Sequence, residues 1–316
     1  MSVSIISLGQ RRLVIADPKM AEVIDLAKRA SKTTSPVFLC GESGSGKELI
    51  ARYIHNESNR SRGPFVTINC AAVPDGLMES ELFGHERGAF TGAVAQHLGK
   101  FERANNGTLL LDEVSEMSIH LQAKLLRVLQ EGELDRLGGR DIVPINCRVI
   151  STTNRDPKES ISQSLFREDL FYRLNVIRID CPALRGRPEA IEALALEFLQ
   201  QASSRQGKSI NRISAEVMNK LKDHSWPGNI RELQNVIERA VLLSDSNKLE
   251  HVELEEWIKE MKEAGQGTGL LRLEDVEKNH ILEMLDHTQG NRTLAASQLG
   301  ISVRTLRNKL KIYQIA

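Results

Sequence analysis

Hydrophobic residues in the first half of the chain form short continuous runs separated by stretches with helical spacing. A run of four or five apolar residues is typical of a strand buried on both faces of a sheet. The predicted strands are Val37–Cys40, Phe65–Ile68, Thr108–Leu111, Arg148–Thr152 and Val176–Ile179. The predicted helices between and before them are Pro18–Ala30, Glu48–His55, Gly76–Phe83 and Ile119–Glu131. This alternation predicts an α/β fold with a mainly parallel sheet between helices.

The pattern changes after Arg187, where helical spacing continues to about Lys262. A glycine-rich stretch follows, and residues from Leu271 onward are again helical in pattern. The length of 316 residues exceeds one typical domain. We therefore expect an N-terminal lead-in (1–12), an α/β core (13–183), a helical lid (184–262), a linker (263–271) and a C-terminal helical domain (272–316).

Composition excludes several classes of protein. Hydrophobic residues make up 41% of the chain, the formal net charge is +0, and no apolar run is long enough to span a bilayer. The start lacks the basic segment and apolar core of a signal peptide. The four cysteines have no CxxC spacing and the histidines no ligand spacing. We expect a cytoplasmic protein with buried thiols, no membrane partner and no structural metal.

A glycine-rich loop follows the first of these strands and precedes a predicted helix. Its residues are Gly41, Glu42, Ser43, Gly44, Ser45, Gly46, Lys47 and Glu48, which match the phosphate-loop pattern G-x-x-x-x-G-K. Its backbone N–H groups and the helix N-terminus can bind an anion, and Lys47 can reach the outer phosphates. Glu48 departs from the pattern, because Ser or Thr ordinarily holds magnesium there. A plain hairpin loop is the alternative, which the flanking elements and a second nucleotide motif disfavour.

The second motif is Asp112-Glu113, directly after an apolar strand. Both carboxylates emerge at the carboxyl end of the strand, beside the phosphate loop. We expect Asp112 to hold Mg²⁺, directly or through water, and Glu113 to polarise a water for attack on the γ-phosphate of ATP. The alternative is that two acids merely cap a strand, and the phosphate loop upstream disfavours it.

The C-terminal residues carry the pattern of a helix-turn-helix. Thr293–Leu299 and Val303–Ile312 are predicted helices, separated by a tight turn in which Ser302 caps the second helix. From Arg292 onward the chain has five basic residues and no acidic ones, which favours contact with DNA phosphates. The predicted DNA-binding residues are Arg292, Thr293, Arg304, Thr305, Arg307, Asn308 and Lys309. A helical hairpin with solvated lysines is the alternative.

These motifs together resemble those of a known family. Gly41–Glu48, the hexapeptide Gly88–Ala93, Asp112-Glu113 and the stretch Trp226–Leu233 resemble the bacterial enhancer-binding activators of sigma-54 RNA polymerase, a branch of the AAA+ ATPases. The hexapeptide is highly specific to that branch, which also usually carries glutamate at Glu48. The resemblance implies an AAA+ P-loop NTPase core, an all-helical lid and a Fis-type helix-turn-helix.

The resemblance also implies roles for individual residues. The loop of Gly88, Ala89, Phe90, Thr91, Gly92 and Ala93 would contact the sigma factor, with Phe90 as an apolar tip. A Phe90 tucked into the core is the alternative. Asn69 would pair with the catalytic Glu113, Thr153 and Asn154 would form the first sensor, and Arg231 would be a second sensor that contacts nucleotide from the lid.

Two further arginines, Arg167 and Arg173, resemble the family's fingers, which reach into the site of the neighbouring subunit. A guanidinium there stabilises charge on the transferring phosphoryl group and accelerates hydrolysis ~10³–10⁵-fold. Surface Arg–Glu pairs of ~0.3–0.5 kcal/mol are the alternative. Fingers imply a hexameric or heptameric ring. Gly186 and Ala190 replace the family's usual carboxylates, which puts charge pairing between core and lid in question.

Family members dimerise through the helix before the helix-turn-helix, here Glu274–His287, so we expect two half-sites ~34–36 Å apart on enhancer DNA.

The function expected is ATP-dependent remodelling of a closed sigma-54 RNA polymerase holoenzyme complex into an open one. Another AAA+ protein remodeller, or a DNA-binding regulator with a silent ATPase, are the alternatives. Few residues precede the core, so we expect no receiver domain, and control by a separate partner or by a longer parent protein both remain open.

Overall fold

The computed structural model of the protein describes residues 3–9, 11–252, 281, 284–285, 288 and 291–313. The chain divides into two compact units, Met1–Glu253 and Leu254–Ala316. Among the described residues, no helix is long and apolar enough to cross a membrane.

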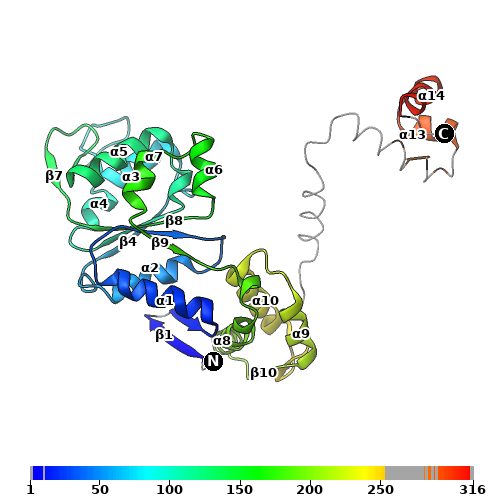
Figure 1. Cartoon of the computed structure of the whole chain (residues 1–316), viewed down its shortest axis with the longest axis horizontal. Coiled ribbons are helices and arrows are strands. Elements are labelled where there is room, and N and C mark those ends of the chain that lie inside the picture. Colours follow the sequence, from blue (N-terminus) through cyan, green and yellow to red (C-terminus); the bar gives the residue numbers. More distant parts are fainter. Residues whose placement is uncertain are drawn as a thin grey trace. The chain divides into compact units, whose positions relative to one another are not determined.

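A five-stranded parallel sheet forms the centre of the first unit (Figure 1). In spatial order its strands are β4 (Phe65–Asn69), β5 (Thr108–Asp112), β8 (Arg148–Thr153), β3 (Val37–Cys40) and β9 (Ile177–Asp180). The five predicted strands are confirmed to within one residue at each end. Since β3 lies between β8 and β9, the phosphate loop that follows it emerges between these two strands at the carboxyl edge of the sheet.

Helices cover both faces of this sheet. One face carries α1 (Pro18–Ser31) and α2 (Lys47–Asn56), and the other carries α3 (Asp75–Phe83), α4 (Lys100–Arg103), α5 (Ile119–Glu131) and α7 (Glu168–Leu174). Successive residues of β3 serve opposite faces, with Val37 and Leu39 in one core and Phe38 in the other. The short helix α6 (Pro157–Ser162) follows β8. The predicted α/β layers are therefore confirmed.

Two hairpins were not predicted. The N-terminal hairpin pairs β1 (Ser4–Leu8) with β2 (Arg11–Ile15) and packs Leu8 and Leu13 against the core on the α1 side. It runs through the expected boundary after residue 12, so the lead-in has regular structure. The other hairpin pairs β6 (Glu133–Asp135) with β7 (Ile142–Pro144) at the end of α5.

The lid consists mainly of helices α8 (Glu189–Gln206), α9 (Ala215–Asp223) and α10 (Asn229–Leu243). The sequence did not predict the short parallel pair β10 (Arg212–Ile213) and β11 (Lys248–Leu249) that joins its loops. Trp226 is completely buried in the lid, and its ring N–H donates to the carbonyl of Leu221 at 2.8 Å. The predicted helical residues 253–262 lie outside the described part of the chain.

Charge pairing joins core and lid despite Gly186 and Ala190. Arg12 lies 3.0 Å from the buried carboxylate of Glu197 on α8. Arg187, at the start of the lid, is buried with its guanidinium 4.0 Å from the buried Asp17 at the N-terminus of α1. The lid side of these two pairs is therefore a carboxylate at Glu197 and a guanidinium at Arg187.

The described part of the C-terminal unit is a helix-turn-helix. Helices α13 (Arg292–Gln298) and α14 (Val303–Ile312) pack Ala295, Ala296, Leu306 and Leu310 around Ile281. Ser302 accepts the backbone N–H of Thr305 at 3.0 Å, which is the predicted cap. The predicted dimerisation helix Glu274–His287 lies outside the described residues apart from 281, 284 and 285.

All four cysteines are unpaired thiols, as expected. Cys40, Cys70 and Cys181 are buried, whereas Cys147 is half-buried. Burial raises the pKa of Cys40 to about 11 and that of Cys70 and Cys181 to about 12, so these thiols are protonated and unreactive near neutral pH.

Candidate functional site

The phosphate loop connects β3 to α2 at the carboxyl edge of the sheet. Gly44 and Gly46 adopt left-handed φ angles of 73° and 101°, which glycine adopts without strain and which turn the loop into the N-terminus of α2. Lys47 is buried, and its ammonium group donates to the carbonyls of Gly41 at 2.7 Å and Glu42 at 3.2 Å. The loop therefore closes around its own lysine, at a helix N-terminus suited to an anion.

Asp112 and Glu113 lie at the end of β5, as predicted. Thr152 on β8 joins them: its hydroxyl donates to Asp112 Oδ1 at 2.7 Å and accepts the backbone N–H of Glu113 at 3.0 Å. Glu113 has a left-handed φ of 57°, a conformation that a non-glycine residue keeps only when its surroundings hold it. Sequence reasoning missed Thr152, although a polar residue near the end of an apolar strand was a signal for it.

Glu113 faces the phosphate loop. One of its carboxylate oxygens lies 3.5 Å from Lys47 Nζ, and the other accepts the backbone N–H of Asn154 at 2.9 Å. The adjacent Thr153, a predicted sensor residue, is buried, and its hydroxyl shares a hydrogen bond of 2.8 Å with Ser115. The two predicted sensor positions and the carboxylate predicted to be catalytic are therefore brought together.

The partner predicted for Asn69 differs from the one observed. Asn69 was expected to pair with Glu113, but its amide donates to Asp112 Oδ2 at 3.3 Å. The strand register explains the difference, because Asn69 lies directly opposite Asp112 in the β4–β5 pair. Glu113 points instead toward Lys47 and Asn154.

A cavity of about 490 Å³ lies beside the phosphate loop, Asp112 and Glu113 and extends to the lid. It is lined by residues 43–49 of the loop, by Asp112 and Glu113, by β2, and by lid residues on α8 and α10. Arg231, the predicted second sensor, lines it and donates to Ser43 Oγ at 3.0 Å. Apolar residues Leu13, Val14, Leu194, Phe198 and Ile230 form the rest of a wall suited to a planar base.

Glu48 stands where the general motif has a hydroxyl that holds magnesium, but its carboxylate pairs with two arginines. Arg11 on the N-terminal hairpin lies 2.7 Å from one of its oxygens, and Arg52 donates to the other at 2.8 Å. Burial raises the pKa of Glu48, but the hydrogen bonds from Arg11 and Arg52 outweigh it and hold that pKa below its ordinary value. Glu48 therefore ties the hairpin to α2 as a carboxylate.

The lid is hydrogen-bonded directly to the phosphate loop through Asn229, a contact that sequence reasoning missed. Its buried amide donates to Glu42 Oε2 at 3.1 Å and to the carbonyl of Ser43 at 3.0 Å, and accepts the N–H of Leu184 at 2.8 Å. A Cβ on Gly44 would collide with the carbonyl oxygen of Gly228, so glycine is required there. Core and lid thus meet backbone to backbone at the loop.

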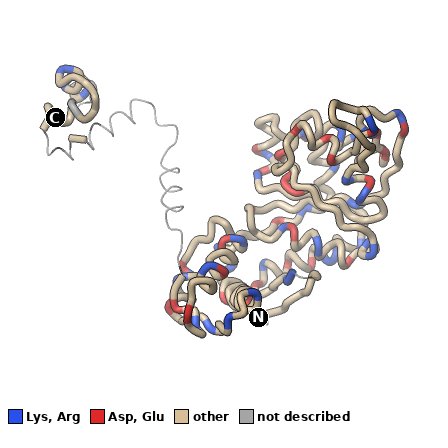
Figure 2. The backbone as a smooth tube through the Cα atoms, turned by 180° about the vertical axis from the view of Figure 1, so that it is seen from behind, with Lys and Arg blue, Asp and Glu red and all other residues tan. Residues whose placement is uncertain are grey.

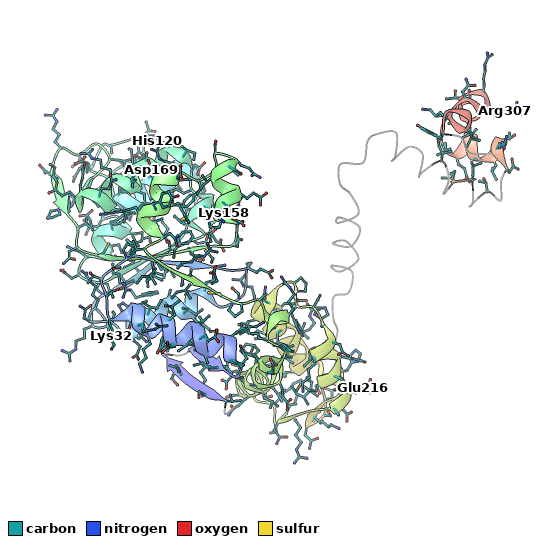
Figure 3. All side chains as sticks on the ribbon, in the orientation of Figure 1. Lys32, His120, Lys158, Asp169, Glu216 and Arg307 are labelled. Atoms are coloured by element: carbon teal, nitrogen blue, oxygen red, sulfur yellow. The ribbon has the colours of Figure 1, made fainter. Side chains whose placement is uncertain are left out.

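The two predicted fingers lie elsewhere on the surface of the core. Arg167 precedes α7 and donates to both oxygens of Asp169 at 3.0 and 2.7 Å (Asp169 is labelled in Figure 3). Arg173, in the last turn of α7, donates to the carbonyl of Leu129 at 2.6 Å. Neither lines the cavity of its own chain.

The hexapeptide loop is a closed turn on the surface. The backbone N–H of Gly88 donates to the carbonyl of Ala93 at 2.8 Å, and both glycines of the loop have left-handed φ angles. Phe90 is 40% exposed, and its ring lies edge-on to His85 with centroids 4.9 Å apart. Thr91 is exposed. Phe90 is therefore neither in the core nor free, but rests on the base of its own loop.

The β6–β7 hairpin supports this loop. Gly138 lies so close to Ala89 that a Cβ there would be 2.8 Å from the Ala89 methyl group. Arg136 joins both sides of the loop, at 2.7 Å from Glu86 before it and 2.6 Å from Glu102 after it. Sequence reasoning missed this support, although Gly138-Gly139 between two short runs was a turn signal.

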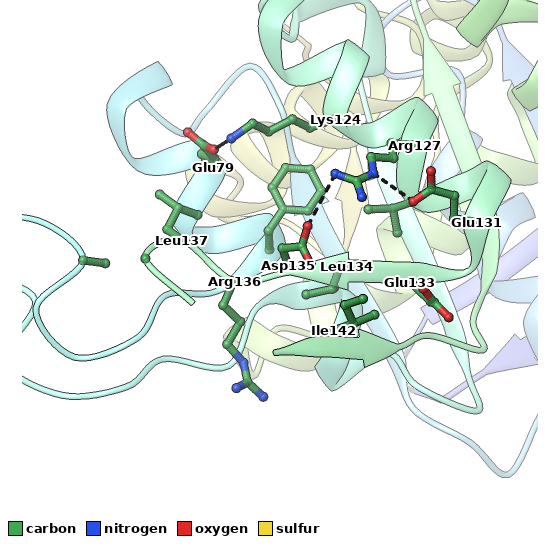
Figure 4. A pocket seen from close by; sticks show the side chains of 14 residues that line it. Glu79, Lys124, Arg127, Glu131, Glu133, Leu134, Asp135, Arg136, Leu137 and Ile142 are labelled. Atoms are coloured by element: carbon green, nitrogen blue, oxygen red, sulfur yellow. Dashed lines mark hydrogen bonds and ion pairs between the residues drawn. The ribbon is translucent and has the colours of Figure 1, made fainter. Parts of the chain in front are cut away.

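A pocket of about 390 Å³ lies between α3, α5 and this hairpin (Figure 4). Along α5 Arg127 pairs with Glu131 at 2.8 Å. Between elements Arg127 also pairs with Asp135 of the hairpin at 3.4 Å, and Lys124 pairs with Glu79 of α3. Ala89 and Phe83 also line it, so its shape depends on the position of the hexapeptide loop.

The helix-turn-helix presents a basic surface. Figure 2 shows basic but no acidic positions on its described residues. Arg292, Thr293, Arg304, Arg307 and Asn308 are exposed, and Thr305 and Lys309 are half-buried. The predicted DNA-binding residues are therefore accessible on α14 and at the start of α13.

Three known protein families match consecutive parts of the chain. Residues 13–180 match the sigma-54 interaction domain, residues 185–269 match the AAA+ ATPase lid domain, and residues 272–313 match the Fis family of bacterial regulatory proteins.

Individual relatives agree with these matches. The transcriptional regulatory protein FlbD of Caulobacter vibrioides is 45% identical over 97% of this chain and 71% of its own length. The regulatory protein AtoC of Escherichia coli is 48% identical over 94% of this chain and 67% of its own length. The crystal structure of NtrX from Brucella abortus in complex with ATP superposes with a TM-score of 0.72 at 36% identity, over 96% of this chain and 69% of that one.

Proposed function

Because this chain belongs to the family of sigma-54-dependent transcriptional activators, with an AAA+ ATPase domain and a DNA-binding helix-turn-helix, we propose that it remodels the closed promoter complex of sigma-54 RNA polymerase into the open one. We place the ATPase core at residues 13–183, the lid at 184–262 and the DNA-binding domain at 272–316, and the protein in the cytoplasm.

Hydrolysis would take place in the cavity between the phosphate loop and the lid. Lys47 and the loop N–H groups bind the phosphates, Arg231 contacts the nucleotide from the lid, and Glu113 takes the proton of the attacking water. The contact of Glu113 with Lys47 supports this assignment, because it places the carboxylate 3.5 Å from the lysine of the phosphate loop.

The site also suits Mg²⁺. A carboxylate oxygen is the ligand that this ion prefers, and Asp112 offers two that are oriented by Thr152 and Asn69. Glu48 is engaged by two arginines, so Asp112 would hold the ion, directly or through water. Bound Mg²⁺ would neutralise charge on the β- and γ-phosphates.

Assembly would complete the site. Arg167 and Arg173 lie outside the cavity of their own chain, on a segment that also exposes Leu165, Tyr172 and Val176. An exposed apolar patch around two arginines fits an interface in which the arginines reach the phosphates of a second copy. We infer a hexameric or heptameric ring with one active site at each subunit boundary.

Nucleotide-dependent movement would act on the sigma factor through residues 88–93. Asn69 ends β4 beside Asp112, and the chain continues through α3 into His85 and the loop. Phe90 rests on His85, so a shift of this base would release or withdraw the apolar tip. The helix-turn-helix would hold the ring on enhancer DNA as a dimer, through phosphate and base contacts of Arg292, Thr293 and the exposed side of α14.

The observation that carries the proposal is the convergence of Lys47, Asp112, Glu113 and Arg231 on one cavity in a chain with the sigma-54 interaction domain. The test is to measure ATP turnover and open-complex formation by sigma-54 polymerase with the same preparation. Turnover without open complexes would favour another AAA+ remodeller, and DNA binding without turnover would favour a silent ATPase.

A further inference from the structure

Gln122 on α5 is a buried polar residue with no role in the chemistry described above. Its side chain is completely buried, and its amide makes three hydrogen bonds, all to backbone groups. The amide N–H₂ donates to the carbonyl of Met117 at 2.7 Å and to that of Leu165 at 2.9 Å. The amide oxygen accepts the backbone N–H of Arg167 at 2.8 Å.

The partners of Gln122 belong to two functional segments. Met117 ends the short 3₁₀ helix η1 (Val114–Glu116), which begins directly after Glu113. Ser115 within it shares a hydrogen bond with the sensor Thr153, so this helix is fixed to the nucleotide site. Leu165 and Arg167, in contrast, form the entry to α7 and carry the finger side chain.

Only a primary amide of this length satisfies all three backbone groups. The site requires two donors and one acceptor, and the three bonds determine which way the amide faces. Methionine has a similar length and volume but would leave the two carbonyls and the N–H without the partner that Gln122 provides. A carboxylate would place negative charge against two carbonyl oxygens.

We propose that Gln122 is a positioning residue that couples the Glu113 segment of one subunit to the Arg167 finger which that subunit offers to its neighbour. This inference rests on the proposed function, specifically on the finger acting across the subunit boundary. A movement of η1 when the subunit's own γ-phosphate is bound or lost is transmitted through the amide to Leu165–Arg167. The state of one site thereby sets the position of the finger in the next.

Mixed rings separate this coupling from a general effect on folding. A Glu113→Gln chain is a finger donor, since it keeps Arg167 but cannot hydrolyse ATP. An Arg167→Ala chain is an acceptor, since its own site is intact but it does not offer Arg167 to its neighbour. Mixing the two creates sites with an intact cavity and a donated finger, so turnover should recover. Absence of recovery overturns the finger assignment and this proposal with it.

The decisive variant places Gln122→Met in the donor alone. The loss of one hydrogen bond of this kind changes an equilibrium constant about tenfold. The turnover recovered in the mixed rings should therefore fall at least about tenfold, while ATP binding by the donor is unchanged. The matched control is a donor with Leu126→Ala, a buried apolar position on the same helix, which should lower the melting temperature without lowering recovered turnover. Equal recovery with Gln122→Met and the parent donor overturns the proposal but leaves the finger assignment intact.

A second readout tests the coupling itself. In rings made of Gln122→Met chains alone, the dependence of turnover on ATP concentration should lose its cooperativity, with a Hill coefficient near one. If the methionine variant does not fold, Gln122→Asn keeps the amide but is one methylene too short to span both segments. Unchanged cooperativity in the folded variant overturns the coupling.

Discussion

A carboxylate oxygen of Glu113 lies 3.5 Å from the ammonium group of Lys47. The same lysine donates to two carbonyls of the phosphate loop, and the same glutamate accepts the N–H of Asn154. The lysine predicted to bind phosphate and the glutamate predicted to activate water therefore belong to one network of polar contacts.

Lys47→Ala and Glu113→Gln should separate binding from chemistry. Without the lysine, the phosphates lose their cation and Glu113 is left partly buried beside them, so ATP binding should be abolished. The glutamine keeps the shape of the site but cannot take a proton, so binding should persist and hydrolysis should be lost. Calorimetric titration with ATP and a phosphate-release assay measure the two effects, and hydrolysis by the glutamine variant would contradict the role of Glu113.

Thr91→Ala should uncouple hydrolysis from transcription. Thr91 is exposed in a loop that is held by Phe90 and by its own backbone, and it does not line the nucleotide cavity, so substantial ATP turnover should remain. Open complexes, detected by permanganate footprinting of the promoter, should disappear. Normal transcription by this variant would remove the loop from the interface with the sigma factor.

Gly44→Ala should damage the contact between lid and phosphate loop. The new methyl group would collide with the carbonyl of Gly228 and would also require a non-glycine residue at a φ of 73°. Gly207→Ala is the matched control, because Gly207 has a φ of 64° and open space around it, so it should cost only ~1 kcal/mol of stability. Gly44→Ala should be less stable than this control and should bind ATP more weakly, as measured by melting temperature with and without ATP.

Replacing Arg304 and Arg307 with glutamine should weaken enhancer binding and leave ATP turnover unchanged. Both side chains are exposed on α14. Each lost phosphate contact should reduce the slope of log affinity against log salt by about one. The control is Arg29→Gln on α1, an exposed arginine in the other unit. Unchanged DNA affinity and salt slope would show that α14 is not the DNA-binding helix.

His55 should make the protein less stable in acid. The ring is buried on α2 and bonded to Thr108 Oγ1 at 2.9 Å, and its pKa is lowered by burial and then by Arg52 and Arg148. The folded state disfavours protonation of His55. The stability that the neutral ring contributes is therefore complete above the unfolded pKa of about 6.5 and is lost as the pH falls through the lower folded pKa. His55→Gln should reduce the fall in the free energy of unfolding between neutral and mildly acidic pH, measured by urea titration. His120→Gln, at an exposed position of α5, should not (Figure 3).

Local patterns made much of this molecule predictable. The strands of the sheet, the helix Ile119–Glu131 and the cap at Ser302 follow from the spacing of apolar residues and from turn chemistry within a few residues. The phosphate loop and Asp112-Glu113 were predictable for the same reason, since a strand that precedes a polar motif also determines where the motif lies.

The contacts that sequence reasoning missed join residues far apart in the chain. Asn229 bonds to Glu42 across 187 positions, and Thr152 reaches Asp112 across 40. The pattern around each of these residues is only that of a helix start or a strand end. Asn69 was assigned the wrong partner because its opposite neighbour depends on strand register, which the apolar runs leave undetermined.

The hydrogen bonds between Asn229 and the phosphate loop link the position of the lid to that of the loop. Its amide is bonded to the loop on one side and to the backbone N–H of Leu184 on the other, so a rotation of α10 against the core would pull on the loop. We therefore expect the lid to tilt when a phosphate leaves the site. A pair of fluorescent labels, one on α1 and one on α9, would report the occupancy of the nucleotide site as a change in the distance between the two labels.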